Sequence, residues 1–233
     1  MKQIIAMGGG GFSMEPDNLA LDRYILKQTE NKHPKVCFVP TASGDAESYL
    51  LKFYQACGEL DCRPTHLSLF RLPTADLEGF VLEQDIIYVG GGNTRSMLAL
   101  WREWGLDAIF RKAYEAGIIL AGISAGANCW FEQSTTDSVP GGLQVLAGLG
   151  LLKGSFTPHY DGEQERRPSL HRLLKDDKIQ AGFAVDNSAA LHFVDGQLLC
   201  GVCSVSTAKA YWVSCKDRQV IEETLEIKDI SIK

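Results

Sequence analysis

A serine between glycines, in residues 122–126, is the part of the chain whose residue types and spacing most clearly suggest chemistry. The segment reads G-x-S-x-G; a β-prone apolar run, residues 118–121, precedes it, and a run that can start a helix, residues 125–130, follows it. In such a strand-to-helix turn the small neighbours allow a sharp bend, which exposes the serine at the edge of a sheet. The next amide, that of Ala125, lies at a helix N-terminus and can donate to a developing oxyanion. The pattern predicts that Ser124 is a nucleophile.

A serine nucleophile needs a general base, which is normally a histidine. His159 follows an apparent strand, residues 154–158, and precedes a loop, residues 160–163. This position is at the carboxyl end of a strand, on the same edge of the sheet as Ser124, so we predict that His159 is the base. The other histidines are expected in a charged loop, in strands or on a helix: His33, His66, His192 and His171.

The third member of such a triad is a carboxylate that fixes the tautomer of the imidazole and stabilises the imidazolium. Asp186 ends the run 181–185, and this strand-end position favours it as the partner of His159. Asp137 lies shortly after the segment that follows Ser124, where it could line the pocket or hold the serine loop. The sequence leaves both aspartates open, with a preference for Asp186.

Two glycine runs follow predicted strands. The run 90–92 follows the strand 86–89, and Asn93 or Thr94 would cap the helix that begins there. Its backbone amides could also face a substrate oxyanion, and Asn93 is a candidate substrate-binding residue. The run 8–11 has neither the helix start of a dinucleotide fingerprint nor the Lys-Ser/Thr pair of a P-loop. We therefore expect no nucleotide and no other cofactor.

The elements that must position these residues alternate along the first two-thirds of the chain. Short apolar runs alternate with amphipathic stretches, which is typical of βα units on a parallel sheet. The expected strands are residues 3–7, 36–40, 66–69, 85–89 and 117–121, and the helices begin near Asn18, Ala46, Thr94 and Leu106. Because a ligand crevice forms at the carboxyl ends of such strands, the loops after them are expected to gather there.

The pattern changes after about residue 150. A strand at 154–158 and a helix at 165–174 precede closely spaced strands at 180–185, 189–194, 197–205, 208–214 and 219–227. Asp195-Gly196 is a strong hairpin turn. These strands are expected to form an antiparallel edge, and the absence of a linker predicts one domain over residues 1–233.

Composition narrows the class of protein. A net charge of −6 and the lack of a basic block argue against a nucleic-acid or membrane surface. Seven cysteines without a repeating spacing indicate a reduced, cytoplasmic compartment. Cys200 and Cys203 lie in an apparent strand without a second Cys or His pair, so they predict a structural role and no metal site. Unpaired edge strands in the last third would suit a homodimer.

Together these residues resemble the peptidase E (aspartyl dipeptidase) family of serine peptidases, to which cyanophycinases are related. The resemblance rests on residues 89–94, 122–128, 135–137 and 158–159, and it extends from the first strand to about residue 205. It implies an α/β fold like that of class I glutamine amidotransferases, a flavodoxin-like arrangement, with serine where those enzymes have cysteine.

The resemblance also implies roles for single residues. Ser124 would be the nucleophile and His159 the base, with the amides of Gly92 and Ala125 as oxyanion donors. Both Asp137 and Asp186 match positions proposed for the acid. An arginine after the histidine would bind the side chain of an N-terminal Asp in the substrate, and Arg166 falls about there, although the spacing of residues 163–168 departs from the family pattern.

Three functions follow as hypotheses. The first is a serine peptidase without a cofactor that acts on short peptides, including those that begin with an acidic residue. The second keeps the same triad but takes an amide, an ester or a cyanophycin-type isopeptide as substrate. The third is a non-catalytic ligand-binding protein on the same fold.

Overall fold

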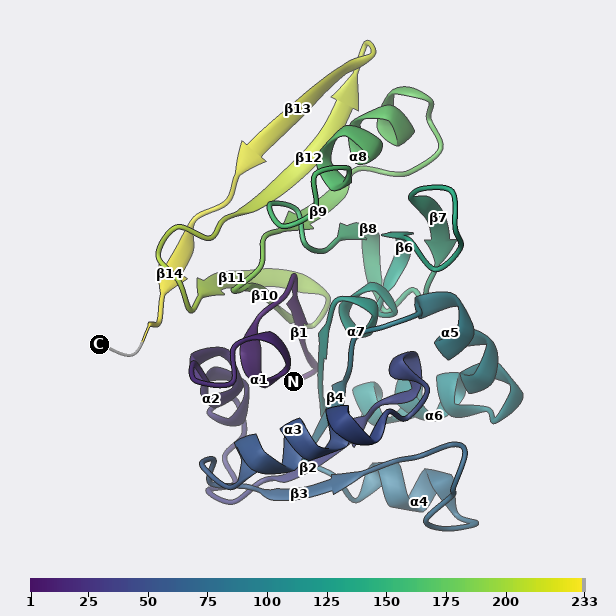
Figure 1. The fold of residues 1–233 in the computed structure, drawn as a ribbon, viewed down its shortest axis with the longest axis vertical. Coiled ribbons are helices and arrows are strands. Elements are labelled where there is room, and N and C mark those ends of the chain that lie inside the picture. Colours follow the sequence, from purple (N-terminus) through teal and green to yellow (C-terminus); the bar gives the residue numbers. More distant parts are fainter. Residues whose placement is uncertain (232–233) are drawn as a thin grey trace.

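The computed structural model describes residues 1–231, which form two β-sheets and the helices around them (Figure 1). The larger sheet has eight strands in the order β14-β11-β10-β1-β5-β4-β2-β3. Its strands are β1 Gln3–Met7, β2 Lys35–Val39, β3 Arg63–His66, β4 Ile86–Val89, β5 Ile119–Ile123, β10 Ala189–Val194, β11 Gln197–Cys203 and β14 Ile227–Asp229. From β1 to β3 the neighbours are parallel, whereas β10 is antiparallel to both β1 and β11. The predicted α/β class, with a mostly parallel central sheet and an antiparallel C-terminal edge, is confirmed.

Helices cover both faces of this sheet, and for this reason its central strands are continuous apolar runs. Every residue of β4 and β5 is buried. Because side chains alternate along a strand, Phe38 of β2 packs with α1, α2 and α3, whereas Val39 packs with α4, α5 and α6. The bounds are α1 Gly11–Met14, α2 Ala20–Leu26, α3 Glu47–Cys57, α4 Leu77–Leu82, α5 Thr94–Glu103 and α6 Leu106–Glu115, with a 3₁₀ turn at Thr41–Ser43.

The second sheet has six strands in the order β13-β12-β9-β8-β6-β7. Its strands are β6 Phe131–Thr136, β7 Gln144–Ala147, β8 Leu152–Thr157, β9 Gly182–Val185, β12 Ala210–Lys216 and β13 Gln219–Thr224. The strands β6, β8 and β9 are parallel, and the outer strands are antiparallel to them or to each other. Figure 1 shows the hairpin β12–β13 extending beside α8 (Arg166–Lys175) at one end of the molecule.

This second sheet corrects the expected arrangement of the last third of the chain. The sequence predicted an antiparallel edge formed by the later strands, and β10 and β11 lie there, but β9, β12 and β13 belong to a second sheet together with β6, β7 and β8. The strands β6 and β7 were not predicted, nor were the short helices α1 and α4. The run of β6, FEQSTT, shows little apolar periodicity because several of its buried residues are polar. The hydroxyls of Thr135 and Thr136 are satisfied there by hydrogen bonds to the hydroxyls of Thr157 and Thr94.

Loops after four strands meet at one edge of the molecule. The strands β1, β4 and β5 lead into residues 8–11, 90–93 and Ser124, and β8 of the second sheet leads into His159. The amide of His159 donates to the carbonyl oxygen of Gly8 at 3.2 Å, which joins the loops after β8 and β1. A cavity opens at this edge, where the carboxyl ends of parallel strands place a ligand crevice.

Candidate active site

Ser124 is the single residue between β5 and the short helix α7 (Ala125–Asn128). Its φ of 55° and ψ of −113° lie outside the regions that non-glycine residues ordinarily adopt, so the bend carries backbone strain of roughly 1–3 kcal/mol. Hydrogen bonds hold the bend: the Ser124 amide donates to the Met7 carbonyl at 3.1 Å, and the Ser124 carbonyl accepts two amides of α7 at 2.9 Å. A Cβ at Gly122 would lie 2.1 Å from the Gly126 carbonyl oxygen, which explains why glycine stands there. The G-x-S-x-G segment thus has the local geometry predicted for it.

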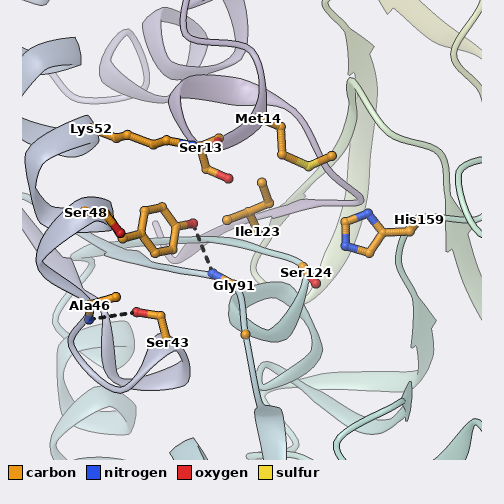
Figure 2. A pocket seen from close by; sticks show the side chains of 12 residues that line it. Ser13, Met14, Ser43, Ala46, Ser48, Lys52, Gly91, Ile123, Ser124 and His159 are labelled. Atoms are coloured by element: carbon orange, nitrogen blue, oxygen red, sulfur yellow. Dashed lines mark hydrogen bonds between the residues drawn. The ribbon is translucent and has the colours of Figure 1, made fainter.

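His159 faces the same cavity as Ser124 (Figure 2). It lies two residues after the end of β8 and, like Ser124, has a positive φ, of 53°. Within residues 1–231 no direct hydrogen bond joins the Ser124 hydroxyl to the imidazole. Such catalytic hydrogen bonds often tighten only when substrate is bound. The structure therefore brings the predicted nucleophile and base to one cavity wall.

The imidazole has a fixed partner that the sequence did not suggest. Nδ1 of His159 lies 2.7 Å from Oδ1 of Asn187, in the turn after β9. The amide of Asn187 donates in turn to Oδ1 of Asp161 at 2.8 Å. With the Asn187 oxygen as acceptor, Nδ1 carries the proton and Nε2 is left as the basic atom. Asn187 is thus the residue in position to hold the tautomer.

The expected partner, Asp186, has a different contact. Its Oδ2 accepts the Lys209 amide at 2.9 Å, while its Oδ1 is buried without a hydrogen-bond partner among the described residues. Burial, together with the negative charge of Asp161, raises the pKa of Asp186 to about 6. Side chains alternate in direction along an extended chain, so the neighbours 186 and 187 point to opposite sides. The exact position at which β9 ends therefore determines that residue 187, and not residue 186, faces the imidazole.

The other predicted carboxylate, Asp137, is far more exposed and lies 3.6 Å from the guanidinium of Arg166. Arg166 is buried, and Glu163 holds it in a two-pronged ion pair, with Nε–Oε2 and Nη2–Oε1 distances of 2.6 and 3.2 Å. Arg166 is not among the residues that line the cavity. In this structure the predicted substrate-binding arginine is therefore already neutralised by the protein's own carboxylates.

The glycine turn after β4 lines the cavity and has one amide without an acceptor among the described residues. Gly92 has a φ of 136°, and a Cβ there would lie 2.2 Å from the Ala42 carbonyl oxygen, so only glycine fits. The Gly91 amide donates to the Tyr49 hydroxyl at 3.2 Å, whereas the Gly92 amide has no acceptor among residues 1–231. Ala125 begins α7, and the first amides of a helix have no partner within it. Both predicted oxyanion donors are thus free to bind.

Asn93, a candidate for substrate binding, has a structural role at both ends of its side chain. Its Oδ1 accepts the Ser96 amide at 2.9 Å and so caps α5. Its Nδ2 donates to the Ser138 carbonyl at 2.9 Å. The side chain therefore fastens the loop after β6 to the start of α5.

The cavity has a volume of about 420 Å³ and is bounded by elements that are distant in sequence (Figure 2). The helix α1 contributes Ser13 and Met14, and α3 contributes Tyr49 and Lys52. Opposite them lie the turn at Gly91 and Gly92, the Ser124 bend and His159. No sequence pattern marks α1 and α3 as cavity walls, because their contribution depends on how they pack against the sheet.

Comparisons with known proteins identify the family of the chain. The model of peptidase family S51 matches residues 4–200. The chain belongs to peptidase family S51. A relative named "Uncharacterized peptidase YgaJ", from Bacillus subtilis, is 57% identical over 228 residues, which are 98% of this chain and 99% of the relative. Peptidase E of Streptomyces coelicolor is 30% identical over 130 residues, about half of each chain. The resemblance to the peptidase E family is confirmed, and this S51 chain is a peptidase.

Solved structures support the fold of this S51 chain. A peptidase from an acI-B1 Actinobacterium has a TM-score of 0.68 and 17% identity, with 97% of each chain covered. A putative peptidase E protein from Listeria monocytogenes has a TM-score of 0.61 and 19% identity, and 97% of this chain and all of that one are covered. At these identities the likeness concerns the fold alone.

Two further features of the described residues concern metal binding and membrane insertion. Residues 1–231 hold no group of three or more His, Cys, Asp or Glu side chains arranged to bind a metal ion. Over the same residues, no helix combines the length and the apolar character needed to cross a bilayer.

Proposed function

We propose that this S51 chain is a serine-type peptidase that hydrolyses short peptides at the cavity beside Ser124. The observation that carries the proposal is the strained Ser124 bend, which shares a cavity with His159 while Asn187 orients the imidazole. A cavity of about 420 Å³ suits a ligand of dipeptide size, since pockets of this range bind small molecules.

The proposed mechanism uses groups already in place. Ser124 attacks the scissile carbonyl while Nε2 of His159 takes the hydroxyl proton, and the same imidazole then gives that proton to the leaving amine. The amides of Gly92 and Ala125 hold the oxyanion of the tetrahedral intermediate, each contributing roughly 3 kcal/mol in the transition state. Water then attacks the acyl-enzyme ester while Nε2 of His159 takes a proton from it, and this proton passes to the Ser124 oxygen as the acyl group leaves.

We assign the orienting role to the Asn187 amide oxygen instead of a carboxylate. An amide can fill this place, as in the Cys-His-Asn arrangement of papain-like proteases. Asp186 and Asp137 then have other roles. Asp186 accepts a hydrogen bond from the backbone amide of Lys209, just before β12, and Asp137 adds to the neutralisation of Arg166.

Hydrolysis of a dipeptide panel that contains Asp-Xaa, Glu-Xaa and neutral Xaa-Xaa tests the function. Ser124→Ala is expected to lower kcat/KM by about 10⁴-fold or more on every substrate that the wild type cleaves. The matched control is Ser48→Ala, at another serine of the same cavity that lies within α3 and not at a strand-to-helix bend, which should retain activity within a few-fold.

Equal rates for wild type and Ser124→Ala would contradict the nucleophile. Cleavage without any preference for Asp-Xaa would contradict specificity for an N-terminal Asp. Ammonia release from simple amides, without peptide cleavage, would favour an amidase on the same site.

A further inference from the structure

The cavity beside Ser124 has one permanently charged side chain among its described lining residues, that of Lys52. The other lining side chains are apolar, hydroxyl-bearing or the imidazole of His159. A carboxylate that enters this cavity therefore meets a single cation, and it lies on α3. In the view of Figure 2, Lys52 and His159 lie at opposite ends of the pocket, with Ser13 and Met14 between them.

Lys52 is held at the cavity but keeps most of its hydrogen-bonding capacity. Its Nζ donates to the Ser13 carbonyl of α1 at 3.2 Å. An ammonium has three donors, so two remain for a ligand. Within residues 1–231, no carboxylate oxygen lies within 4 Å of this Nζ, so its charge is not balanced by an ion pair.

Arg166 differs in each of these respects. Its guanidinium is buried, bonded twice to Glu163 and close to Asp137. A substrate carboxylate would have to displace Glu163 from a buried charge, which is costly because the displaced carboxylate would lose a charge-assisted pair. Lys52 requires no such exchange.

We propose that Lys52 is the specificity-determining residue that binds a carboxylate of the peptide substrate. The proposal rests on the function proposed above. The carboxylate comes either from an acidic side chain of the substrate or from its C-terminal α-carboxylate, and both offer the same charge and oxygen acceptors. The distance of Lys52 from the reacting atoms, at the far end of the pocket from His159, suits a binding role and not a role in proton transfer.

Four substrates separate these two sources: Asp-Leu, Asn-Leu, Asp-Leu-amide and Asn-Leu-amide. Lys52→Met is expected to raise KM by roughly 5- to 20-fold for the substrates that carry the recognised carboxylate and to change kcat little. If the side chain is recognised, Asp-Leu and Asp-Leu-amide lose affinity and Asn-Leu does not. If the terminus is recognised, Asp-Leu and Asn-Leu lose affinity and the amides do not.

Two controls accompany this variant. Lys52→Arg keeps the charge and should restore most of the affinity. Lys27→Met, at an exposed lysine outside the cavity, should leave KM unchanged. An equal rise of KM on Asn-Leu-amide, which has no carboxylate, or no change on any substrate, would overturn the assignment.

A binding measurement makes the outcome independent of turnover. Calorimetry of Asp-Leu with Ser124→Ala and with Ser124→Ala/Lys52→Met compares affinities in proteins that cannot act through Ser124. A Kd that is 5- to 20-fold higher for the double variant than for Ser124→Ala supports the role of Lys52 even if the hydrolysis assay fails. Equal affinities reject Lys52, whereas full hydrolysis by Ser124→Ala rejects the proposed nucleophile instead.

Discussion

At the scale of single residues, the two side chains assigned to proton transfer share an unusual backbone. Ser124 and His159 have φ values of 55° and 53°, and each follows the end of a strand. Non-glycine residues adopt such angles when surrounding hydrogen bonds enforce them, and strain of this kind concentrates at functional sites. Here the amides of Ser124 and His159 donate to the carbonyls of Met7 and Gly8, two consecutive residues at the end of β1. One strand end therefore sets the relative position of nucleophile and base.

Asn187→Ala tests the orienting contact at the same scale. Removing Oδ1 leaves Nδ1 of His159 without its acceptor, so the imidazole loses its fixed tautomer and direction. We expect kcat to fall by roughly 10- to 100-fold with little change in KM, because the loss concerns proton transfer and not substrate binding. Steady-state kinetics on the best dipeptide measure this.

The conservative variant Asn187→Asp keeps an oxygen acceptor at the same place and should lose less activity than Asn187→Ala. An alanine variant as active as the wild type, with an unchanged circular dichroism spectrum, would show that the Asn187 contact is dispensable.

At the scale of elements, the cavity depends on α1, a helix of four residues that is too short to be stable alone. Asp22 of α2 holds it in place: Oδ2 accepts the Phe12 amide at 2.9 Å, and Oδ1 accepts the Tyr88 hydroxyl at 3.3 Å. Because α1 carries Ser13 and Met14, these contacts connect the cavity wall to β4 of the central sheet.

A second element-scale contact lies beyond the family match, which ends at residue 200. Glu222 of β13 accepts a short hydrogen bond from the Tyr160 hydroxyl, and its Oε1 lies 2.6 Å from Nε2 of His171 in α8. Burial alone would raise the pKa of Glu222, but these hydrogen bonds and the charge of Arg167 lower it. The hairpin β12–β13 thereby fastens the residue that directly follows His159.

Burial of Asp22 predicts a pH dependence of stability. Burial raises the pKa of its carboxyl from 3.8 to about 6 in the folded protein, against the hydrogen bonds from Phe12 and Tyr88. Between about pH 4 and 6 the folded state therefore binds more protons at Asp22 than the unfolded state does. The free energy of unfolding falls as the pH rises through this range, by at most ~3 kcal/mol for a shift of this size.

Asp22→Asn cannot lose a proton, so it should lack this part of the pH dependence. Between pH 4 and pH 7.5 we expect the free energy of unfolding to fall by about 1–3 kcal/mol more in the wild type than in the variant, as measured by urea denaturation at both pH values. Asp186 titrates equally in both proteins, so its contribution cancels. Parallel pH profiles for the two proteins would contradict the prediction.

At the scale of the whole molecule, aromatic side chains join the two sheets. Phe193 of the central sheet packs edge-on against Phe131 and Phe183 of the second sheet, with ring centroids 5.7 and 5.2 Å apart. The same cluster of buried residues includes Leu120 and Phe156. After the family match, β12 and β13 extend the second sheet from β9, and β14 extends the central sheet by pairing with β11.

This shared core predicts that residues 1–233 unfold as one cooperative unit. Tryptophan fluorescence and far-ultraviolet circular dichroism should give coincident urea transitions with the same midpoint. Deletion of residues 207–233 removes β12, β13 and β14 and uncovers buried residues of β9 such as Ala184, so the shortened chain should fail to fold. Two separate transitions in the intact protein would show two independent domains.

Several features of the fold and site could be predicted from the sequence because their determinants are local. The apolar runs of the parallel strands and the glycines around Ser124 act within a few residues of chain. The strand predicted for residues 154–158 ends at Thr157 in the structure, and its end places His159 at the edge of the sheet as predicted. The α/β class and the strand-to-helix bend at Ser124 follow from such short-range patterns.

Other features were decided only by the tertiary structure, because they depend on groups that are distant along the chain. His159 meets Asn187, 28 residues away, and Lys52 meets Ser13, 39 residues away. The pairing of Arg166 with Glu163 depends on the loop conformation that burial imposes. The division of the later strands between two sheets is of the same kind, since a strand's apolar pattern specifies a buried face and not the strand that lies beside it.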